Sequence, residues 1–462
     1  MNIIIQLTKY LFIFLILLFT VRGFISLALK NEKRKKKILF GQFRVIFIFE
    51  ILGFAIILYN TKNVMMAMLL AAILIYDAVT YVSYRLIYPE ASMLLVNNML
   101  MLLGIGFVMI ARLNPDQAIK QFMIAAAATV IAFIIPVIIR RFRFFSRLTW
   151  IYAVIGIAAL CGVLVLARMS GGAKLSISVG GITIQFSELV KITLVFFMGS
   201  KLAKDRSFQS VAITTVVAAL HVLILVLSTD LGTALVFFVT YIVMVFVATR
   251  NPVWPLAGLA GGSVAAVAAY HLFSHVKQRV VAWKDPFAVY DTSGYQIAQG
   301  LFAIGAGGWF GTGLFQGKPK TIPVATKDFI YAAICEEFGC IFGIALLLIC
   351  MCMYLLIVNI SMLIRNRFYR LVAIGLGTEY AFQVFLTVGG VTKLIPMTGI
   401  TLPLVSYGGS SVMSTIIMLA IIQGLYLRRE DEGEEFIETL IEEENRTGNE
   451  ERDRRRRPEY YA

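Results

Sequence analysis

Charged residues are scarce in this sequence. Asp, Glu, Lys and Arg make up only 15% of the 462 residues, against about 25% in ordinary soluble domains, and 59% of the residues are hydrophobic. Apolar runs of roughly 20 residues, long enough to cross about 30 Å of hydrocarbon as helices, recur along almost the whole chain. The composition therefore excludes a soluble domain of any size and predicts an all-α polytopic membrane protein.

Histidine and cysteine are also scarce, and their positions exclude the chemistry that they usually support. The five cysteines lie inside apolar runs, and none has a Cys or His partner at metal-ligand spacing in a loop. A free cysteine in such a position packs as a small hydrophobic side chain. Of the three histidines, His221 falls in the middle of a predicted helix. We expect neither a zinc site nor a histidine-based active site.

The apolar runs predict about thirteen membrane spans. The first run, residues 11–29, has no small-residue cleavage site before the basic stretch that follows, so we expect a retained helix and not a signal peptide. The predicted spans are centred near residues 18, 53, 73, 102, 131, 158, 195, 218, 240, 262, 343, 379 and 419. An odd number of spans puts the two ends of the chain on opposite sides.

The net charge of +15 does not indicate nucleic-acid binding, because of how it is distributed. From residue 428 onward, eight Arg and thirteen Asp or Glu give the tail about −5, which leaves about +20 on the rest. These positive charges cluster on alternate loops, at residues 33–37, 140–147, 201–206 and 365–370. Cytoplasmic loops are enriched in Lys and Arg. We therefore predict that these loops and the C-terminus are cytoplasmic and that the N-terminus is outside.

One predicted outer loop, residues 274–327, has a charge that is unusual for its side of the membrane. It contains six Lys or Arg and two Asp, a net charge of +4. An anionic ligand would account for this excess. The alternative is that the charge has no role, since long loops cross the membrane largely regardless of charge.

The C-terminal segment, residues 428–462, is acidic and then rich in arginine. Charge blocks of this kind are usually disordered. We predict a mostly disordered cytoplasmic tail. The alternative is a short surface or partner-binding helix, since Phe436, Leu440 and Ile441 have the spacing of one helical face.

Two polar motifs lie at the ends of predicted spans, where ionisable groups are costly and suggest function. The first, QFSELVK at residues 185–191, places Glu188 and Lys191 on one helical face, so an intrahelical ion pair is the alternative to a functional role. The second, STDLGTA at residues 228–234, contains Asp230, which could simply cap the helix that follows.

Two further motifs are rich in glycine. Residues 294–339 contain GYQ, then GAGGWFGTG, then TKDFIY and EEFG. No βαβ unit surrounds these glycines, so they suggest close backbone approach or a re-entrant turn and not a dinucleotide site. Residues 389–411 (GGVTKLIPMTGITLPLVSYGGSS) contain too much Gly and Pro to form one regular helix. Irregular backbone at membrane depth packs on protein or lines a cavity.

The four motifs, in this order and at these separations, resemble the SEDS family of bacterial cell-wall proteins (FtsW/RodA/SpoVE). The similarity extends over about residues 93–427 and includes residues 111–121, which resemble the first outer loop of some members. The family core has ten helices, so the resemblance implies a SEDS-type core preceded by about three extra helices in residues 1–92. We expect these extra helices to be dispensable for the chemistry and to serve stability or partner binding.

The sequence departs from the family pattern in the loop before the first motif and within two motifs. The usual Trp of that loop is missing, because Gly172, Ala173 and Lys174 are followed by Leu and Ser. Phe186 and Thr229 replace prolines of the family motifs. These departures concern substrate contacts and leave the expected fold unchanged.

The resemblance implies that the protein polymerises lipid II at the outer face of the bacterial cytoplasmic membrane. The anomeric carbon of a polyprenyl-pyrophosphate-linked glycan is transferred to the 4-hydroxyl of an incoming GlcNAc. The expected catalytic carboxylate is Asp328, for which helix capping is the alternative role. The expected substrate-binding residues are Gln185, Ser187, Glu188, Lys191, Asp230, Lys318, Lys320, Lys327, Lys393, Ser406, Tyr407 and Ser410.

The resemblance also implies partners. They are the growing glycan chain, a class B penicillin-binding transpeptidase and other division or elongation proteins, without nucleic acid. No covalently bound cofactor is expected, although a divalent ion such as Mg²⁺ or Mn²⁺ could assist. Two alternatives stay open at this point, a lipid II flippase and a scaffold without catalysis. The resemblance implies that the polymer serves division, elongation or sporulation.

Overall fold

The computed structural model describes residues 2–142, 144–166, 177–179 and 182–429. The loop that lacks the family's Trp, residues 172–176, and the tail from residue 430 lie outside the described residues. The predictions made for that loop and for a disordered tail therefore stay predictions.

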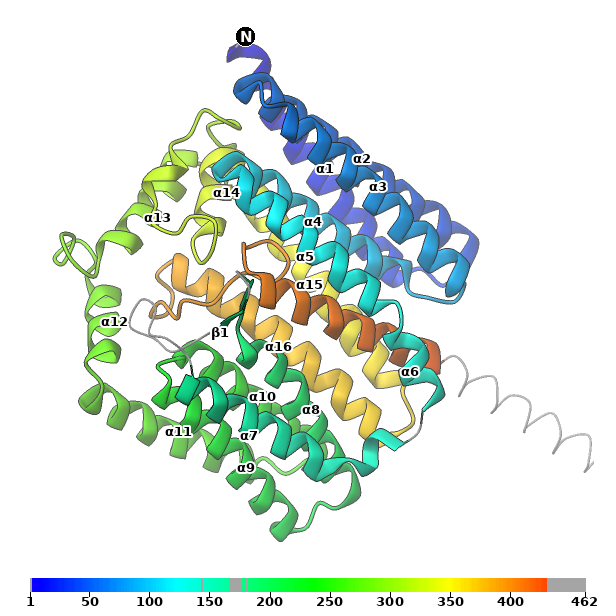
Figure 1. Ribbon diagram of the computed structural model, residues 1–462, viewed down its shortest axis with the longest axis vertical. Helices are drawn as coiled ribbons and strands as arrows, with labels where there is room; N and C mark the ends of the chain where they lie inside the picture. The colour runs from blue at the N-terminus through cyan, green and yellow to red at the C-terminus, as the bar shows by residue number, and fades with distance from the viewer. Residues whose placement is uncertain (1, 143, 167–176, 180–181, 430–462) are drawn as a thin grey trace, which may run out of the picture.

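Twelve helices of the described residues are long and apolar enough to cross a membrane, and the chain is a multi-pass membrane protein (Figure 1). The apolar runs of the sequence form these helices because each satisfies its own backbone hydrogen bonds, which hydrocarbon cannot do. They are α1 (Asn2–Ala28), α2 (Glu32–Thr61), α3 (Val64–Ile87), α4 (Met93–Leu113), α5 (Pro115–Ala132) with its continuation α6 (Ile135–Arg141), α7 (Thr149–Leu166), α9 (Phe208–Leu227), α10 (Leu231–Thr249), α11 (Val253–Leu272), α15 (Cys340–Leu363), α16 (Arg367–Val391) and a last helix, Gly409–Arg429.

The predicted count of about thirteen spans differs from these twelve at α8 (Phe186–Lys204). This helix packs against α7, α10 and α16 within the bundle. It contains Glu188, Lys191, Lys201 and Lys204, so it is less apolar than its neighbours.

The predicted outer loop at residues 274–327 is not irregular throughout. It contains α12 (Ser274–Lys284) and α13 (Tyr295–Gly307), and it is followed by α14 (Ile330–Phe338). These helices are too short to be spans, which is why the search for long apolar runs missed them. Figure 1 shows them together at one end of the bundle, opposite α6. The described residues contain one two-stranded antiparallel sheet. It is a hairpin of β1 (Ile177–Val179) and β2 (Ile182–Ile184), in which Ile177 pairs with Ile184.

Glycines allow the two ends of the segment 311–339 to touch. Gly311 and Gly339 have φ angles of +77° and +89°, and a Cβ on Gly339 would lie 2.4 Å from the amide nitrogen of Gly311. The amide of Cys340 also donates to the carbonyl of Gly308 at 2.9 Å. The close backbone approach expected from the sequence is therefore present.

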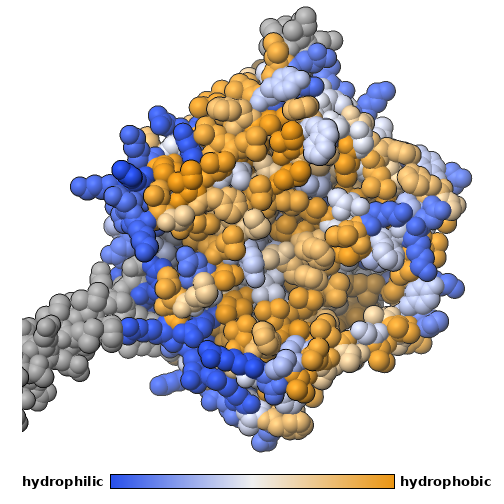
Figure 2. Space-filling view, turned by 180° about the vertical axis from the view of Figure 1, so that it is seen from behind, coloured by the Kyte–Doolittle hydropathy of each residue, from blue (hydrophilic) through white to orange (hydrophobic). Residues whose placement is uncertain are grey.

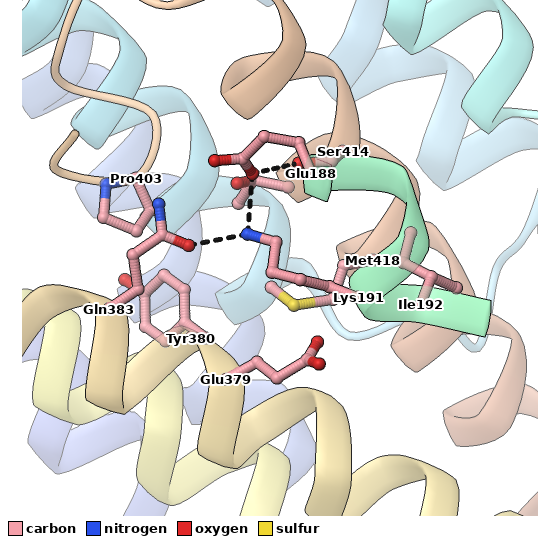
Figure 3. Close-up of a pocket in the computed structure, with 10 residues that line it drawn as sticks. Glu188, Lys191, Ile192, Glu379, Tyr380, Gln383, Pro403, Ser414 and Met418 are labelled. Atoms are coloured by element: carbon pink, nitrogen blue, oxygen red, sulfur yellow. Dashed lines mark hydrogen bonds and ion pairs between the residues drawn. The ribbon is translucent and has the colours of Figure 1, made fainter. Parts of the chain in front are cut away.

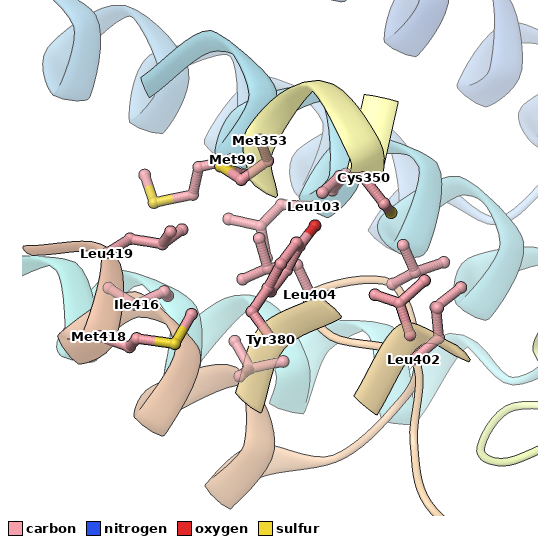
Figure 4. Packing of buried hydrophobic residues seen from close by; sticks show 14 of the residues in the cluster. Met99, Leu103, Cys350, Met353, Tyr380, Leu402, Leu404, Ile416, Met418 and Leu419 are labelled. Atoms are coloured by element: carbon pink, nitrogen blue, oxygen red, sulfur yellow. The ribbon is translucent and has the colours of Figure 1, made fainter. Parts of the chain in front are cut away.

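The centre of the bundle is apolar. Within α4, 94% of the spanning window is buried, whereas in α11 the share is 0%. The fully buried ring of Tyr380 packs among aliphatic and sulfur-containing side chains of four segments, including Met99, Leu103, Met353 and Leu404 (Figure 4). On the outside, Figure 2 shows a broad apolar surface with hydrophilic residues gathered toward its edges. This is the surface expected of a protein whose helices face lipid.

Candidate functional site

The structure brings the four sequence motifs together at one end of the bundle. The amide of Gln185 donates to Ser410 Oγ at 2.8 Å, which joins the first motif to the fourth. Ser187 Oγ donates to Asp230 Oδ2 at 3.0 Å, which joins the first to the second. The amide of Tyr407 donates to the carbonyl of Thr326 at 2.7 Å, which joins the fourth to the third. Residues up to 225 positions apart therefore form one polar region.

Asp230 has two roles in this region. Its Oδ1 accepts a hydrogen bond from the amide of Thr233 at 3.2 Å, which confirms that it caps α10. Its Oδ2 accepts bonds from Ser187 Oγ and, at 3.3 Å, from Gln185 Nε2. Burial raises the pKa of the Asp230 carboxyl, and the bonds from Thr233 and Ser187 oppose this rise.

Asp328 lies in the turn before α14 and does not cap it. The cap residue is Phe329, and no side chain makes a capping hydrogen bond there. The capping alternative for Asp328 is therefore wrong. Burial raises the pKa of the Asp328 carboxyl to about 6, while the positive charges of Lys327 and Arg279 act in the opposite direction. A carboxyl with this pKa can hold or release a proton near neutral pH.

Arg279 interacts electrostatically with both acids. It extends from α12, and its Nη1 donates to the carbonyl of Thr398 at 2.9 Å and to that of Met397 at 3.4 Å. Burial lowers the pKa of Arg279, and the negative charges of both Asp230 and Asp328 raise it. The sequence analysis counted Arg279 only as part of a positive loop, because nothing in the local sequence distinguishes it from Lys277 and Lys284.

Gly399 lies beside both Asp328 and Arg279. Its φ of +78° favours glycine, and a Cβ there would lie 3.7 Å from Asp328 Oδ2 and 4.0 Å from Arg279 Nη2. One point beside this glycine therefore lies within 4.0 Å of both the carboxylate and the guanidinium.

Ser406 and Tyr407 shape the turn that leads to Asp328. Ser406 Oγ donates to the carbonyl of Lys327 at 2.6 Å and accepts from the amide of Leu402 at 2.9 Å. Gln121 supports the same segment, because its Nε2 donates to the carbonyl of Ser406 at 2.8 Å. Gln121 was not among the predicted site residues, although it ends the similar segment 111–121.

Glu188 and Lys191 form a second polar cluster inside the bundle (Figure 3). Their side chains pair at 2.6 Å, which confirms the intrahelical ion pair. Lys191 Nζ donates to Gln383 Oε1 at 2.7 Å, and Ser414 Oγ donates to Glu188 Oε2 at 3.0 Å. Glu379 lines the same small cavity. Gln383 and Glu379 were missed because they lie in the middle of α16, almost 200 residues from Lys191, and match no motif.

The lysines predicted to bind substrate are less closely placed. The side chains of Lys318, Lys320 and Lys327 are exposed and that of Lys393 is half-buried. Among the described residues, no contact joins Lys318 or Lys320 to Asp328. Their loop is nevertheless anchored, because the amide of Lys318 donates to Glu336 Oε1 at 2.7 Å.

Arg112 and Glu337 fix the part of this loop around Phe315. Arg112 Nη2 lies 3.1 Å from Glu337 Oε1, which also accepts the amide of Phe315 at 3.1 Å. Burial raises the pKa of the Glu337 carboxyl to about 7, and the charge of Arg112 opposes the rise. Arg112 lies in the segment 111–121 and Glu337 in the EEFG motif, but their pairing across 225 positions could not be read from the sequence.

The described residues contain no group of three or more His, Cys, Asp or Glu side chains placed to hold a metal ion. Mg²⁺ is often held by one or two carboxylates together with substrate phosphates. Such an ion would therefore need ligands from the substrate as well as from the acids described above.

Comparisons with known proteins show which family the chain resembles. The family model described as a cell cycle protein, FtsW/RodA/SpoVE, matches residues 91–430. The peptidoglycan glycosyltransferase RodA of Mycobacterium bovis is 35% identical over 371 residues, which cover 74% of this chain and 79% of the relative. Stage V sporulation protein E of Bacillus subtilis is 32% identical over 355 residues, which cover 71% and 94%.

A similar fold is found in one chain of a peptidoglycan synthase complex, whose structure concerns the coordination of polymerization and crosslinking by that complex. The chain in that complex has a TM-score of 0.64 and 24% identity, and the alignment covers 73% of the present chain and 98% of its own. The motifs, the nine candidate spans and α8 that follow α3 in the described residues, and the match over most of the sequence lead to one conclusion: the chain belongs to the FtsW/RodA/SpoVE, or SEDS, family.

Proposed function

We propose that the protein is a peptidoglycan glycosyltransferase that polymerises lipid II, and that residues 93–427 perform the reaction. The observation that supports this most directly is the placement of Asp328 and Arg279 beside Gly399, an acid and a hydrogen-bonded cation that each come within 4.0 Å of the same point. The curated relatives of this family include RodA of Mycobacterium bovis, a named peptidoglycan glycosyltransferase.

In the proposed reaction, Asp328 is the general base. Its carboxylate takes the proton of the GlcNAc 4-hydroxyl as that oxygen attacks the anomeric carbon of the growing chain. The new C–O bond forms while the bond between the anomeric carbon and the pyrophosphate oxygen breaks. The electron pair of the broken bond leaves with the polyprenyl pyrophosphate.

Positive charge in the proposed site stabilises the leaving pyrophosphate. Arg279 is held by the carbonyls of Met397 and Thr398, in the irregular segment 392–408 that follows α16. It is therefore oriented before substrate binds. The exposed amines of Lys318, Lys320, Lys327 and the half-buried Lys393 bind the anionic groups of the substrate in this proposal. When bound, a Mg²⁺ or Mn²⁺ ion would add positive charge at the same phosphates.

The remaining predicted site residues have supporting roles in this proposal. Gln185, Ser187, Asp230 and Ser410 form one hydrogen-bonded group, whose Asp230 interacts electrostatically with Arg279, and Ser406 and Tyr407 position the turn before Asp328. The buried Glu188–Lys191 pair links α8 to α16 through Gln383. A flippase would instead use this buried cluster as its substrate site.

We place the site on the outer face of a bacterial cytoplasmic membrane, with the C-terminus in the cytoplasm. The alternation of the basic loops supports this orientation. We also propose that a class B penicillin-binding transpeptidase is a partner, together with other division or elongation proteins. A family relative within a complex that coordinates polymerization and crosslinking supports this assignment.

The test is to incubate the purified full-length protein with lipid II, alone and with a class B penicillin-binding protein, and to measure glycan polymer by gel. We expect polymer, and more of it with the partner. A parallel assay follows fluorescent lipid II across the bilayer of proteoliposomes. Transbilayer movement without any polymer would contradict the enzyme and support the flippase.

A further inference from the structure

The first helix contacts the base of the segment that contains Asp328. Lys9 Nζ on α1 donates to the carbonyl of Gly311 at 3.0 Å, across 302 positions of the chain. Gly311 is the residue whose backbone touches Gly339, where α14 ends. The lysine therefore binds at the point where the two ends of the segment 311–339 meet.

Aromatic side chains extend this contact. The Tyr10 ring lies 5.6 Å from that of Phe310, between ring centroids. The fully buried Phe12 packs edge-on against Phe338 at 5.0 Å and against Phe49 of α2 at 5.4 Å. The extra helices are thus joined to the last residue of α14 by a tightly packed ring cluster.

The two ends of this segment are hydrogen-bonded to each other. The amides of Thr312 and Gly313 donate to the carbonyls of Glu336 and Glu337, each at 2.9 Å. The Arg112–Glu337 pair then fixes the loop that follows. A displacement at Gly311 or Phe338 would therefore be transmitted to the turn at Asp328, because packed interiors transmit strain.

We propose that α1 is a positioning element for the reaction, in which Lys9, Tyr10 and Phe12 hold the base of the segment 311–339 so that Asp328 faces Arg279. This inference rests on the proposed function. It departs from our expectation, so far untested, that residues 1–92 are dispensable for the chemistry. A lysine near the end of a membrane span, as Lys9 is, usually extends its amine to water. Here the amine is bound to a backbone carbonyl of a glycine motif, which gives the extra helix a specific contact with the core.

The test compares three variants of the full-length protein. Lys9→Met removes the ammonium group and keeps an apolar stem, Lys9→Arg restores a donor, and Lys30→Met removes an exposed lysine two residues beyond the other end of α1 as the matched control. Small misplacements of a catalytic group can lower the rate by up to about 100-fold. We expect Lys9→Met to lower kcat for lipid II polymerisation at least about tenfold with little change in KM or Tm, Lys9→Arg to recover most activity, and Lys30→Met to match the wild type.

A second measurement does not depend on activity. Hydrogen exchange of residues 312–329 should be faster in Lys9→Met than in the wild type and in Lys30→Met. Tyr10→Leu, at a half-exposed position, should accelerate exchange in the same direction and replaces Lys9→Met if that variant does not fold. Wild-type kcat and unchanged exchange in Lys9→Met would overturn the inference. If the wild type makes no polymer while Lys9→Met still exchanges faster than the wild type, the proposed function is contradicted and the contact of α1 is supported.

Discussion

At the scale of single residues, Asp328 and Asp285 provide a matched pair of acids. Asp285 is exposed and its Oδ1 accepts bonds from the amides of Phe287 and Ala288, so it stabilises only a local turn. We predict that Asp328→Asn inserts and folds normally but loses about 10²–10⁴-fold in polymerisation rate, as expected for a missing general base. Asp285→Asn should keep most activity. The measurement is glycan polymer from protein with a wild-type thermal unfolding curve, and near-wild-type polymer from Asp328→Asn would reject the assignment.

The pH dependence of the rate should report the same carboxyl. Asp328 acts as a base only when ionised, and its pKa is about 6, so kcat/KM should rise with pH through about 6 and then level off. Arg279 lowers the pKa of Asp328. Arg279→Gln removes that positive charge and should move the midpoint to higher pH, whereas Arg279→Lys should leave it nearly unchanged.

Lys277→Gln is the control for this shift, because Lys277 lies on the same helix with an exposed side chain. Its pH–rate profile should match that of the wild type. A midpoint that stays at the same pH in Arg279→Gln would show that the titrating group is not the Asp328 beside this arginine.

Sequence reasoning found the acids of the site but not their partners. Asp230 and Asp328 lie inside recognisable motifs. Arg279, Gln121 and Gln383 contact these motifs only through the fold, over separations that no local pattern encodes. The role of Asp328 as a helix cap was wrong because α14 begins two residues later than the acid.

At the scale of elements, two glycines of the segment 294–339 should respond differently to a methyl group. Gly339 has a φ of +89° and backbone atoms within 2.5 Å of a built Cβ, so Gly339→Ala adds strain of about 1–3 kcal/mol and a clash besides. Gly305 lies in α13 with open space around it. We predict that Gly339→Ala lowers Tm sharply, while Gly305→Ala leaves it unchanged or slightly raised. Thermal unfolding in detergent measures both, and equal effects would contradict the close contact at Gly339.

The elements that sequence reasoning predicted best are the long apolar ones. Their length and hydrophobicity leave few other structures in a bilayer. The short helices α12 and α13 were read as loop because they are too short for a span. The irregular segment 392–408 was anticipated from its glycines and prolines, although its contacts with residues 326 and 327 were not.

At the scale of the whole molecule, the orientation in the membrane is the main prediction. We expect a cysteine at Ser293, an exposed position, to react with an impermeant maleimide in intact cells, and one at Arg206 to react only after permeabilisation. Cys161 is exposed and should first be replaced, to remove background labelling. The reverse pattern would invert the proposed topology and place the site in the cytoplasm.

The turn before Asp328 is fastened through its main chain. Tyr407 and Ser406 donate to the carbonyl oxygens of Thr326 and Lys327, and neither of those side chains takes part. Position 326 is therefore free to change over evolutionary time without moving the acid, whereas position 406 must retain a hydroxyl donor. We therefore expect natural variation at the two ends of this contact to be asymmetric, and an inherited change at Ser406 to impair an Asp328 that is itself unaltered.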